Sequence, residues 1–358
     1  MPTPLVSIIV TSYNHDNFLE ETLESVFKQT WKNSEVIIVD DASSDSSVNI
    51  IRKYQKKYHC RVILRTENYY SQKQKKGEKP IIEAMNLAQG KYIAVVDSDD
   101  IISPTKIAHQ VNLLEKNPQC AMCYSAIEVI MPDGSHIPYN ETFLNGNVFE
   151  HMLITGNLSL YIGSLIRRDA YLKIERSHPD LVQEDWDMFL KLAKQGDFIS
   201  STRIVAYYRR HDNNTWYRKD NATLMYRNRM SILNYWQHEP AWVNAMNLRW
   251  KQYLHADHML AKCDIDALLK ENATDPLLHA QAAIVAMQNK DTHKLKQHLL
   301  QAIIYSDPRL EILPTLYLLA MKNISEENIR SSILTSLKQR LPDQYPHILA
   351  SLSQVPQQ

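Results

Sequence analysis

Apolar residues in the first hundred positions form short continuous runs that alternate with segments of helical spacing. Short continuous apolar runs are typical of strands that are buried on both faces of a sheet. The predicted strands are 5–10, 35–39, 61–65 and 91–96, and the predicted helices between them are 17–29, 46–57 and 80–89. This alternation predicts an α/β fold with a Rossmann-like, mostly parallel sheet flanked by helices.

The alternation continues to about residue 220, and then the pattern changes. Up to that point we predict a helix at 104–116, a strand near 121–131, a turn at 132–134, a strand at 160–168, a helix at 184–195 and a strand at 203–208. Beyond it we predict only helices, at 222–237, 241–263, 276–288, 291–305, 310–322, 326–340 and 343–352. A chain of 358 residues exceeds the usual size of one domain. We therefore predict an α/β domain over 1–220 and an all-helical domain over 221–358.

Three polar clusters lie at the carboxyl ends of predicted strands. They are Thr11-Ser-Tyr-Asn14, Asp40-Asp41 and Asp97-Ser-Asp99-Asp100. Because ligands of open α/β sheets bind at this edge, the clusters predict one binding site. Asp97 and Asp99 alternate on an extended segment, which directs both carboxylates the same way about 7 Å apart. Such a pair repels itself unless a cation lies in it, and oxygen ligands suit a hard divalent ion. Taken alone, the pair also suits a turn and helix cap ahead of Pro104.

Composition and charge narrow the classes of protein. The 40 basic residues balance the 40 acidic ones, whereas a general nucleic-acid binder should show a basic face. The four cysteines are too few for a disulfide scaffold, and we predict that Cys120 and Cys123 are buried thiols. We expect no signal peptide, because the N-terminus lacks a basic segment and a cleavage site, and no membrane-spanning run. These features predict a cytoplasmic protein.

Three stretches together carry a resemblance to a known family. They read Val6-Ser-Ile-Ile-Val-Thr-Ser-Tyr-Asn14, Val39-Asp-Asp-Ala-Ser-Ser-Asp45 and Ala88-Gln-Gly-Lys-Tyr-Ile-Ala-Val-Val-Asp-Ser-Asp-Asp100. Their order and spacing resemble the family 2 glycosyltransferases of the GT-A fold, over about residues 4–215. The resemblance implies that a hexosyl or N-acetylhexosaminyl group is transferred with inversion from a nucleotide diphosphate, by family habit a UDP-sugar. The implied acceptor is a glycan or lipid-linked glycan of a bacterial surface polysaccharide, such as lipopolysaccharide.

The resemblance also implies which residues bind the donor. They are Thr11, Tyr13, Asn14, Asp41, Asp97, Ser98, Asp99 and Arg210. Thr11 and Tyr13 would flank the base, and Asp41 would accept a hydrogen bond from it. Asp97 would face the ribose or the metal, and Asp99 would bind Mn²⁺ or Mg²⁺.

Glu184 and Asp185 open a predicted helix farther along the chain. Carboxylates favour a helix N-terminus through its dipole, without any catalytic role. In the family they supply the base, so the resemblance implies that Asp185 takes the proton from the acceptor hydroxyl. A base within hydrogen-bond reach of that hydroxyl is worth ~10²–10⁴ in rate.

His211 lies just past the last predicted strand of the α/β domain, in the segment Tyr207-Tyr-Arg-Arg-His-Asp212. The resemblance implies that it completes the metal site with Asp97 and Asp99, or contacts the diphosphate, with Arg210 near the phosphates. A single histidine in such a place is also compatible with a purely structural role.

Two regions lie outside this resemblance. The lysine-rich segment 68–79 replaces a glycine-containing stretch of the family, and it is either a solvated linker or a flap over an anionic ligand. The helices after residue 221 are expected to dock on a partner, to form a homo-oligomer or to lie on the inner face of the cell membrane.

Two other functions remain open. A nucleotidyltransferase should carry a glycine-rich, basic phosphate loop after the first strand, and residues 11–16 have neither glycine nor lysine. A non-catalytic scaffold that binds sugar nucleotides should have lost Asp99 or Asp185, and both are present.

Overall fold

The computed structural model describes residues 3–71, 78–139, 142–177, 181, 184–212, 214, 222–253, 263–307 and 309–310, with 331, 334–335 and 338–339. Internal contacts divide the chain into two compact units, Met1–Tyr217 and Arg218–Gln358. The predicted helices at 310–322, 326–340 and 343–352 lie largely outside the described residues, as do 72–77 of the lysine-rich segment and 254–262.

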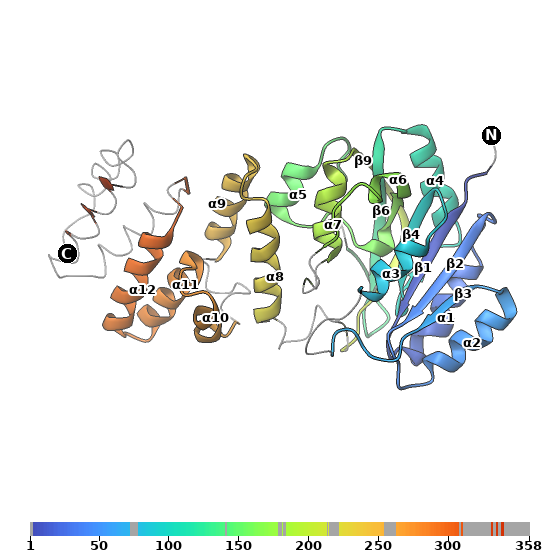
Figure 1. Ribbon diagram of the computed structural model, residues 1–358, viewed down its shortest axis with the longest axis horizontal. Coiled ribbons are helices and arrows are strands. Elements are labelled where there is room, and N and C mark those ends of the chain that lie inside the picture. Colours follow the sequence, from blue (N-terminus) through green and yellow to red (C-terminus); the bar gives the residue numbers. More distant parts are fainter. Residues whose placement is uncertain are drawn as a thin grey trace. The chain divides into compact units, whose positions relative to one another are not determined.

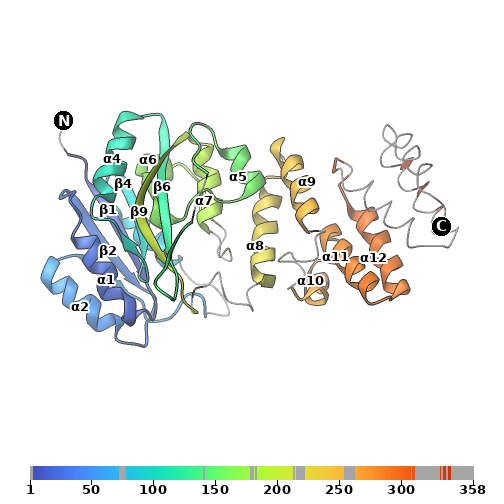
Figure 2. The same cartoon turned by 180° about the vertical axis from the view of Figure 1, so that it is seen from behind.

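A nine-stranded sheet forms the middle of the first unit (Figures 1 and 2). Its order is β3-β2-β1-β4-β8-β6-β9-β5, and β7 pairs with β6. The strands are β1 (Val6–Ser12), β2 (Ser34–Asp40), β3 (Arg61–Leu64), β4 (Tyr92–Asp97), β5 (Ile101–Ile102), β6 (Cys120–Ile130), β7 (His136–Pro138), β8 (Ser164–Arg167) and β9 (Asp197–Arg209). The first four strands in this order are parallel, and β8 then runs antiparallel to both β4 and β6. The sheet, predicted to be mostly parallel, is parallel in its N-terminal part and mixed in the rest.

Helices cover both faces of this sheet. They are α1 (Asp16–Phe27), α2 (Ser47–Tyr58), α3 (Pro80–Leu87), α4 (Lys106–Lys116), α5 (Phe149–Thr155), the 3₁₀ turn η1 (Tyr161–Gly163), α6 (Arg168–Tyr171) and α7 (Glu184–Ala193). Val6, Ile8 and Val10 of β1 share one buried cluster with apolar residues of α1, α2 and α4. α3 packs on β1 and β2, and α7 packs on β6, from outside that cluster. Because successive side chains of a strand point to opposite faces, this places α3 and α7 on the second face.

The segment before β4 contains Gly90, a position at which a side chain has no room. A Cβ at this position would lie 2.6 Å from the backbone nitrogen of Ser7 and 2.9 Å from the carbonyl oxygen of Leu5. The Gly90 backbone N–H donates to Ser7 Oγ at 2.8 Å. Any side chain here would push β4 away from β1, so a glycine is required for the two strands to lie this close.

All regular secondary structure in the described residues of the second unit is helical. Its helices are α8 (Ala222–Tyr235), α9 (Ala241–Tyr253), α10 (Ile265–Glu271), α11 (Pro276–Gln288) and α12 (Thr292–Tyr305). Asp264, Asp275 and Asp291 each cap one of the last three by accepting a backbone N–H bond. The pattern after residue 220 therefore predicted the class of structure, although it missed α10.

Two other sequence predictions concern the whole chain. Cys120 and Cys123 are buried thiols on β6, as predicted. None of the described helices is both long enough and apolar enough to cross a lipid bilayer.

Candidate active site

The ends of β1 and β4 bring the first predicted site residues together. Thr11 pairs with Asp97 in the strand register, and the Thr11 hydroxyl donates to Asp97 Oδ1. The Ser98 backbone N–H donates to the carbonyl of Thr11 at 2.9 Å. Tyr13 follows at the surface with 44% of its side chain exposed, so its ring is accessible to a ligand. The sheet thus holds Thr11, Asp97 and Ser98 at one edge.

Asp41 lies at the same edge, at the end of β2, and its carboxylate is already hydrogen-bonded. It is 3% exposed, and it accepts hydrogen bonds from the Tyr69 backbone N–H at 2.9 Å and from Asn68 Nδ2 at 3.0 Å. Arg65 Nε lies 3.1 Å from its other oxygen. These contacts fix the orientation of the carboxylate, and its bond to a nucleotide base stays a prediction.

Asn14 connects this region to the end of β1. Its φ of 51° is in the left-handed region, which asparagine tolerates better than most residues. The turn lets its side-chain oxygen accept the Ser44 backbone N–H at 2.8 Å, while its own N–H donates to Ser43 Oγ at 2.9 Å. Asn14 therefore ties the two loops that form one wall of the predicted donor site.

Asp99 and His211 meet although 112 residues separate them. His211 Nε2 lies 2.9 Å from Asp99 Oδ2, and Asn214 Nδ2 donates to the same oxygen at 3.2 Å. His15, at the start of α1, approaches the other carboxylate oxygen, with Nδ1 3.8 Å from Oδ1. Burial lowers the pKa of His15, which favours the neutral imidazole that binds metals.

A divalent ion fits this group of residues. One ligand atom from each of His15, Asp99 and His211 lies within 4.8 Å of the others. Two imidazoles and a carboxylate suit the first-row transition metals. Asp99 and His211 of the predicted metal site both belong to this group, and their binding of a metal stays a prediction. Asp97 is not in this group, and its part in metal binding stays a prediction.

Asp97 and Asp100 have raised pKa values. The Asp97 side chain is open to solvent on one side, and protein atoms surround the rest of it. Burial by these atoms, together with the charge of Asp99, raises the pKa of Asp97 to about 7. Asp100 is 1% exposed, and burial together with the charges of Asp99 and Asp97 raises its pKa well above the usual range. Negative charge on Asp97 and Asp100 is thus disfavoured, and a bound cation would lower the pKa of both.

We expect Asp100→Asn to stabilise the metal-free protein at alkaline pH. An amide oxygen can still accept the Arg209 backbone N–H, which is 2.9 Å from Asp100 Oδ1. Because the pKa is raised in the folded state, this carboxyl favours folding most at low pH, and that contribution is lost as the pH rises. The gain in unfolding free energy should be ~1 kcal/mol at about pH 9 and smaller at about pH 5. Thermal unfolding in EDTA measures both values, and a lower melting temperature at both would contradict this account.

Glu184 and Asp185 begin α7, on the second face of the sheet. Asp185 Oδ2 accepts a hydrogen bond from Asn157 Nδ2 at 2.8 Å, and Oδ1 accepts the Trp186 backbone N–H at 2.8 Å. Burial and the neighbouring Glu184 raise the pKa of Asp185 to about 7. The charge of Glu184 also raises the pKa of Asp97, so the start of α7 and the end of β4 act on each other. This places a carboxyl that titrates near neutral pH beside the predicted donor site.

Lys79 and Asn157 are two contributors that the sequence did not reveal. Lys79 is 3% exposed, and its ammonium group donates to the carbonyl of Leu181 and to Glu184 Oε2, the latter at 3.3 Å. Asn157 has its Oδ1 buried without a hydrogen-bond partner among the described residues. Nothing in the sequence pattern distinguishes these two from other loop residues, because their role depends on contacts with α7.

The predicted phosphate ligand Arg210 follows β9. Its backbone N–H donates to the carbonyl of Ile130 at 2.9 Å. Its neighbour Arg209 pairs with Glu21 at 2.6 Å and lies over the ring of Phe18. The guanidinium of Arg209 is therefore held beside α1, and the role of Arg210 at the phosphates stays a prediction.

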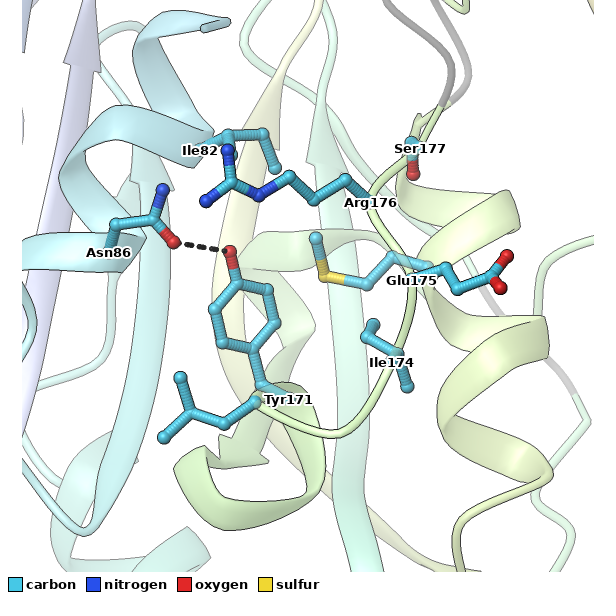
Figure 3. Close-up of a pocket in the computed structure, with 9 residues that line it drawn as sticks. Ile82, Asn86, Tyr171, Ile174, Glu175, Arg176 and Ser177 are labelled. Atoms are coloured by element: carbon cyan, nitrogen blue, oxygen red, sulfur yellow. Dashed lines mark hydrogen bonds between the residues drawn. The ribbon is translucent and has the colours of Figure 1, made fainter.

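Neither of two pockets in the first unit suits a nucleotide sugar. One has a volume of about 120 Å³ and lies between α3 and the segment after α6, where Tyr171 Oη bonds to Asn86 Oδ1 (Figure 3). Pockets for drug-sized ligands measure ~300–1,000 Å³, so this one is too small for the donor. The other, of about 600 Å³, is lined by Glu20, Glu21 and Glu24, which would repel a diphosphate. The strand ends remain the candidate donor site.

Comparisons with known proteins relate this chain to glycosyltransferases. The model of the family described as Glycosyl transferase family 2 matches residues 7–170. An Escherichia coli protein, "UDP-Glc:alpha-D-GlcNAc-diphosphoundecaprenol beta-1,3-glucosyltransferase WfaP", is 31% identical over 216 residues, which are 58% of this chain and 78% of that protein. An uncharacterised glycosyltransferase of Haemophilus influenzae is 26% identical over 59% of this chain and 67% of its own length.

A solved structure extends the likeness to the fold. Residues 1–349 of Staphylococcus aureus TarS, in complex with UDP-GlcNAc, match with a TM-score of 0.57 and 16% identity, covering 93% of this chain and 91% of that one. At this identity the likeness concerns the fold. The predicted GT-A fold followed by a helical C-terminal region is thereby confirmed.

Proposed function

The chain belongs to the family 2 glycosyltransferases, and on that premise we propose that it transfers a sugar from a UDP-sugar to a hydroxyl group of a lipid-linked glycan, with inversion. The observation that carries the proposal is the position of the Asp97 and Asp99 carboxylates near a second carboxylate pair. Glu184 lies close enough to both Asp97 and Asp185 for its charge to raise the pKa of each. A donor held at the strand ends would therefore lie beside a base.

The choice of donor and acceptor rests on relatives. The Escherichia coli relative is named for UDP-Glc and for an acceptor linked to diphosphoundecaprenol. TarS was solved with UDP-GlcNAc and with UDP. We propose that this chain transfers a hexosyl or an N-acetylhexosaminyl group from UDP. A lipid-linked acceptor would place it in the cytoplasm at the inner face of the membrane, with the helices after residue 221 docking on the acceptor, the membrane or a second copy.

The metal part of the proposal uses Asp99 and His211. They would hold Mn²⁺ or Mg²⁺, with Asp97 facing the ribose or the ion, and the bound ion would supply positive charge that neutralises the departing diphosphate. Arg210 would add a cation near the same phosphates. The nearby carboxylates would otherwise repel the donor, so the metal requirement follows from the charge of this edge of the sheet.

The proton transfer belongs to Asp185. Its ionised carboxylate would accept the proton of the acceptor hydroxyl as that oxygen attacks the anomeric carbon from the side opposite the diphosphate. One displacement with one base gives inversion. The Asn157 amide fixes Asp185 Oδ2 at 2.8 Å. This leaves the carboxylate in one orientation for the approaching hydroxyl.

Thermal unfolding with nucleotides tests the donor site. A nucleotide at ~100 times its dissociation constant should add ~2.7 kcal/mol to the unfolding free energy. We expect UDP with Mn²⁺ to give such a shift, and we expect Asp99→Ala to lose it. If no nucleoside diphosphate shifts the well-folded protein, the transferase proposal fails. If nucleotides bind but no sugar is transferred or hydrolysed, the non-catalytic scaffold is the better account.

A further inference from the structure

A histidine outside the quoted sequence motifs, His15, lies beside Asp99 and His211. We propose that His15 is a third protein ligand of the divalent ion, so that the site consists of two imidazoles and one carboxylate. The inference rests on the proposed function insofar as that function puts an ion at Asp99 and His211. The inference goes beyond the proposed function because it assigns the protein ligands of the ion. These ligands in turn determine which metal the site prefers.

The distances suit this ligand set. His211 Nε2 and His15 Nδ1 approach different oxygens of the Asp99 carboxylate, at 2.9 Å and 3.8 Å. A metal–ligand bond of ~2.1 Å puts adjacent ligands of an octahedral ion ~3.0 Å apart and opposite ligands ~4.2 Å apart. The three ligand atoms lie within 4.8 Å of one another. Small side-chain rotations would therefore bring all three onto one ion.

The two imidazoles approach from different directions and are both held in place. Their ring centroids lie 5.5 Å apart with an angle of 87° between the planes. The backbone N–H of His211 donates to Asn214 Oδ1 at 2.6 Å, and its ring packs 4.8 Å from that of Phe18. The backbone N–H of His15 donates to Ser47 Oγ at 3.2 Å. Two loops and the segment after β4 thus hold His15, His211 and Asp99 beside one another.

His15 also has a simpler role available to it. Its Nδ1 lies 2.8 Å from Ser98 Oγ, and in this simpler role His15 would hold the loop after β4 in place without binding a metal. Two features favour a ligand role. The nitrogen that contacts Ser98 is also the ring nitrogen that faces Asp99, so an ion bound between His15, Asp99 and His211 would replace the Ser98 hydroxyl as the partner of Nδ1. Asp99 is also 6% exposed, and a buried carboxylate next to two further acidic residues needs a cation.

The ligand set leads to two measurable properties. With three protein ligands, the ion should bind to the protein without a nucleotide, whereas a site with one or two protein ligands needs the diphosphate to complete it. Imidazole suits transition metals, and oxygen ligands suit Mg²⁺. This site should therefore prefer Mn²⁺ or Co²⁺ over Mg²⁺.

Titration of the nucleotide-free full chain with Mn²⁺, followed by the EPR signal of the free ion, tests the inference. We expect wild-type protein to bind one Mn²⁺, and we expect His15→Gln to weaken that binding at least ~10-fold. His109→Gln is the matched control, because His109 makes the same kind of contact, 2.9 Å from Ser201 Oγ, on α4. It should bind Mn²⁺ like the wild type. Competition with Mg²⁺ should displace Mn²⁺ more readily from the His15 variant.

Three further outcomes are distinguishable. Equal Mn²⁺ affinity in wild type and His15→Gln would overturn the inference and leave the proposed function intact. No Mn²⁺ binding to wild type, with or without UDP, would overturn the metal part of the proposed function as well. Ser98→Ala separates the two roles of His15, since it removes the hydroxyl contact and keeps the imidazole. If Ser98→Ala weakens Mn²⁺ binding as much as His15→Gln does, His15 acts only through Ser98.

A Co²⁺ spectrum provides a readout that loss of folding cannot imitate. Visible absorption of the Co²⁺-loaded protein changes when an imidazole ligand is lost. We expect His15→Gln and His211→Gln each to change the spectrum, and His109→Gln to leave it unchanged. If the His15 variant keeps the wild-type spectrum at full loading, the imidazole of His15 is not a ligand.

Discussion

Asp185→Asn is expected to lower the turnover number for sugar transfer by ~10³, within the ~10²–10⁴ range for the loss of a general base. The amide has nearly the shape of the carboxylate but cannot take a proton from the acceptor hydroxyl. Donor binding should survive, because Asp185 lies on α7 and the donor residues lie at the strand ends. A transfer assay and a thermal shift with UDP and Mn²⁺ on the same sample separate the two properties.

The pH profile of the wild type tests the same role independently. Burial and Glu184 raise the pKa of Asp185 to about 7, and only the ionised form can act as a base. The value of kcat/KM should therefore rise about tenfold per pH unit below about 7 and level off above it. Asp169→Asn, at the exposed first turn of α6, is the matched control, and it should keep both the rate and the profile. An unchanged rate in Asp185→Asn would remove Asp185 from the mechanism.

The edge of the sheet that carries the site could be predicted from the sequence because each of its parts is local. An apolar run that ends in Asp40-Asp41 or in Asp97-Ser-Asp99 specifies a strand and the polar residues at its end. Parallel pairing then brings these ends together, and only Gly90 is needed to explain the close approach of β4 to β1. Local pattern and sheet topology give the same answer there.

The contacts across the site could not be predicted in the same way. Asp99 and His211 were paired only through the family resemblance, since 112 residues separate them. His15, Asn157 and Lys79 lie in or next to loops, where no periodicity marks a side chain, and their partners come from other elements. The predicted strand at 203–208 is shorter than β9, because the first half of β9 is polar and has no apolar pattern to indicate a strand. Pairing with β6 stabilises that half instead.

Lys79→Met is expected to destabilise the first unit by about 3 kcal/mol. Lys79 is 3% exposed, and it neutralises Glu184, whose side chain is 13% exposed. Removing one partner of a buried ion pair costs ~3–5 kcal/mol, because the other charge stays behind uncompensated. The partial access of water to Glu184 puts the estimate at the low end. The midpoint of chemical denaturation measures the loss, and it should fall without a change in the slope.

Two further variants show whether the Lys79–Glu184 pair is the cause. Lys53→Met breaks an exposed pair with Glu20, in which the side chains are 66% and 53% exposed, and it should cost under ~1 kcal/mol. Lys79→Met combined with Glu184→Gln removes both charges and should recover part of the lost stability. If Lys79→Met costs no more than Lys53→Met, the buried pair does not hold the start of α7.

The same variant connects the stability of the fold to its chemistry. The Glu184 charge already raises the pKa of Asp185, and Lys79 offsets that charge. Without Lys79, the Asp185 carboxyl should hold its proton to a higher pH, and the acid side of the kcat/KM profile should move in that direction. A loss of stability alone lowers the amount of active enzyme and leaves the shape of the profile unchanged. A moved profile in Lys79→Met that returns in the double variant would therefore show that the buried ammonium group tunes the base.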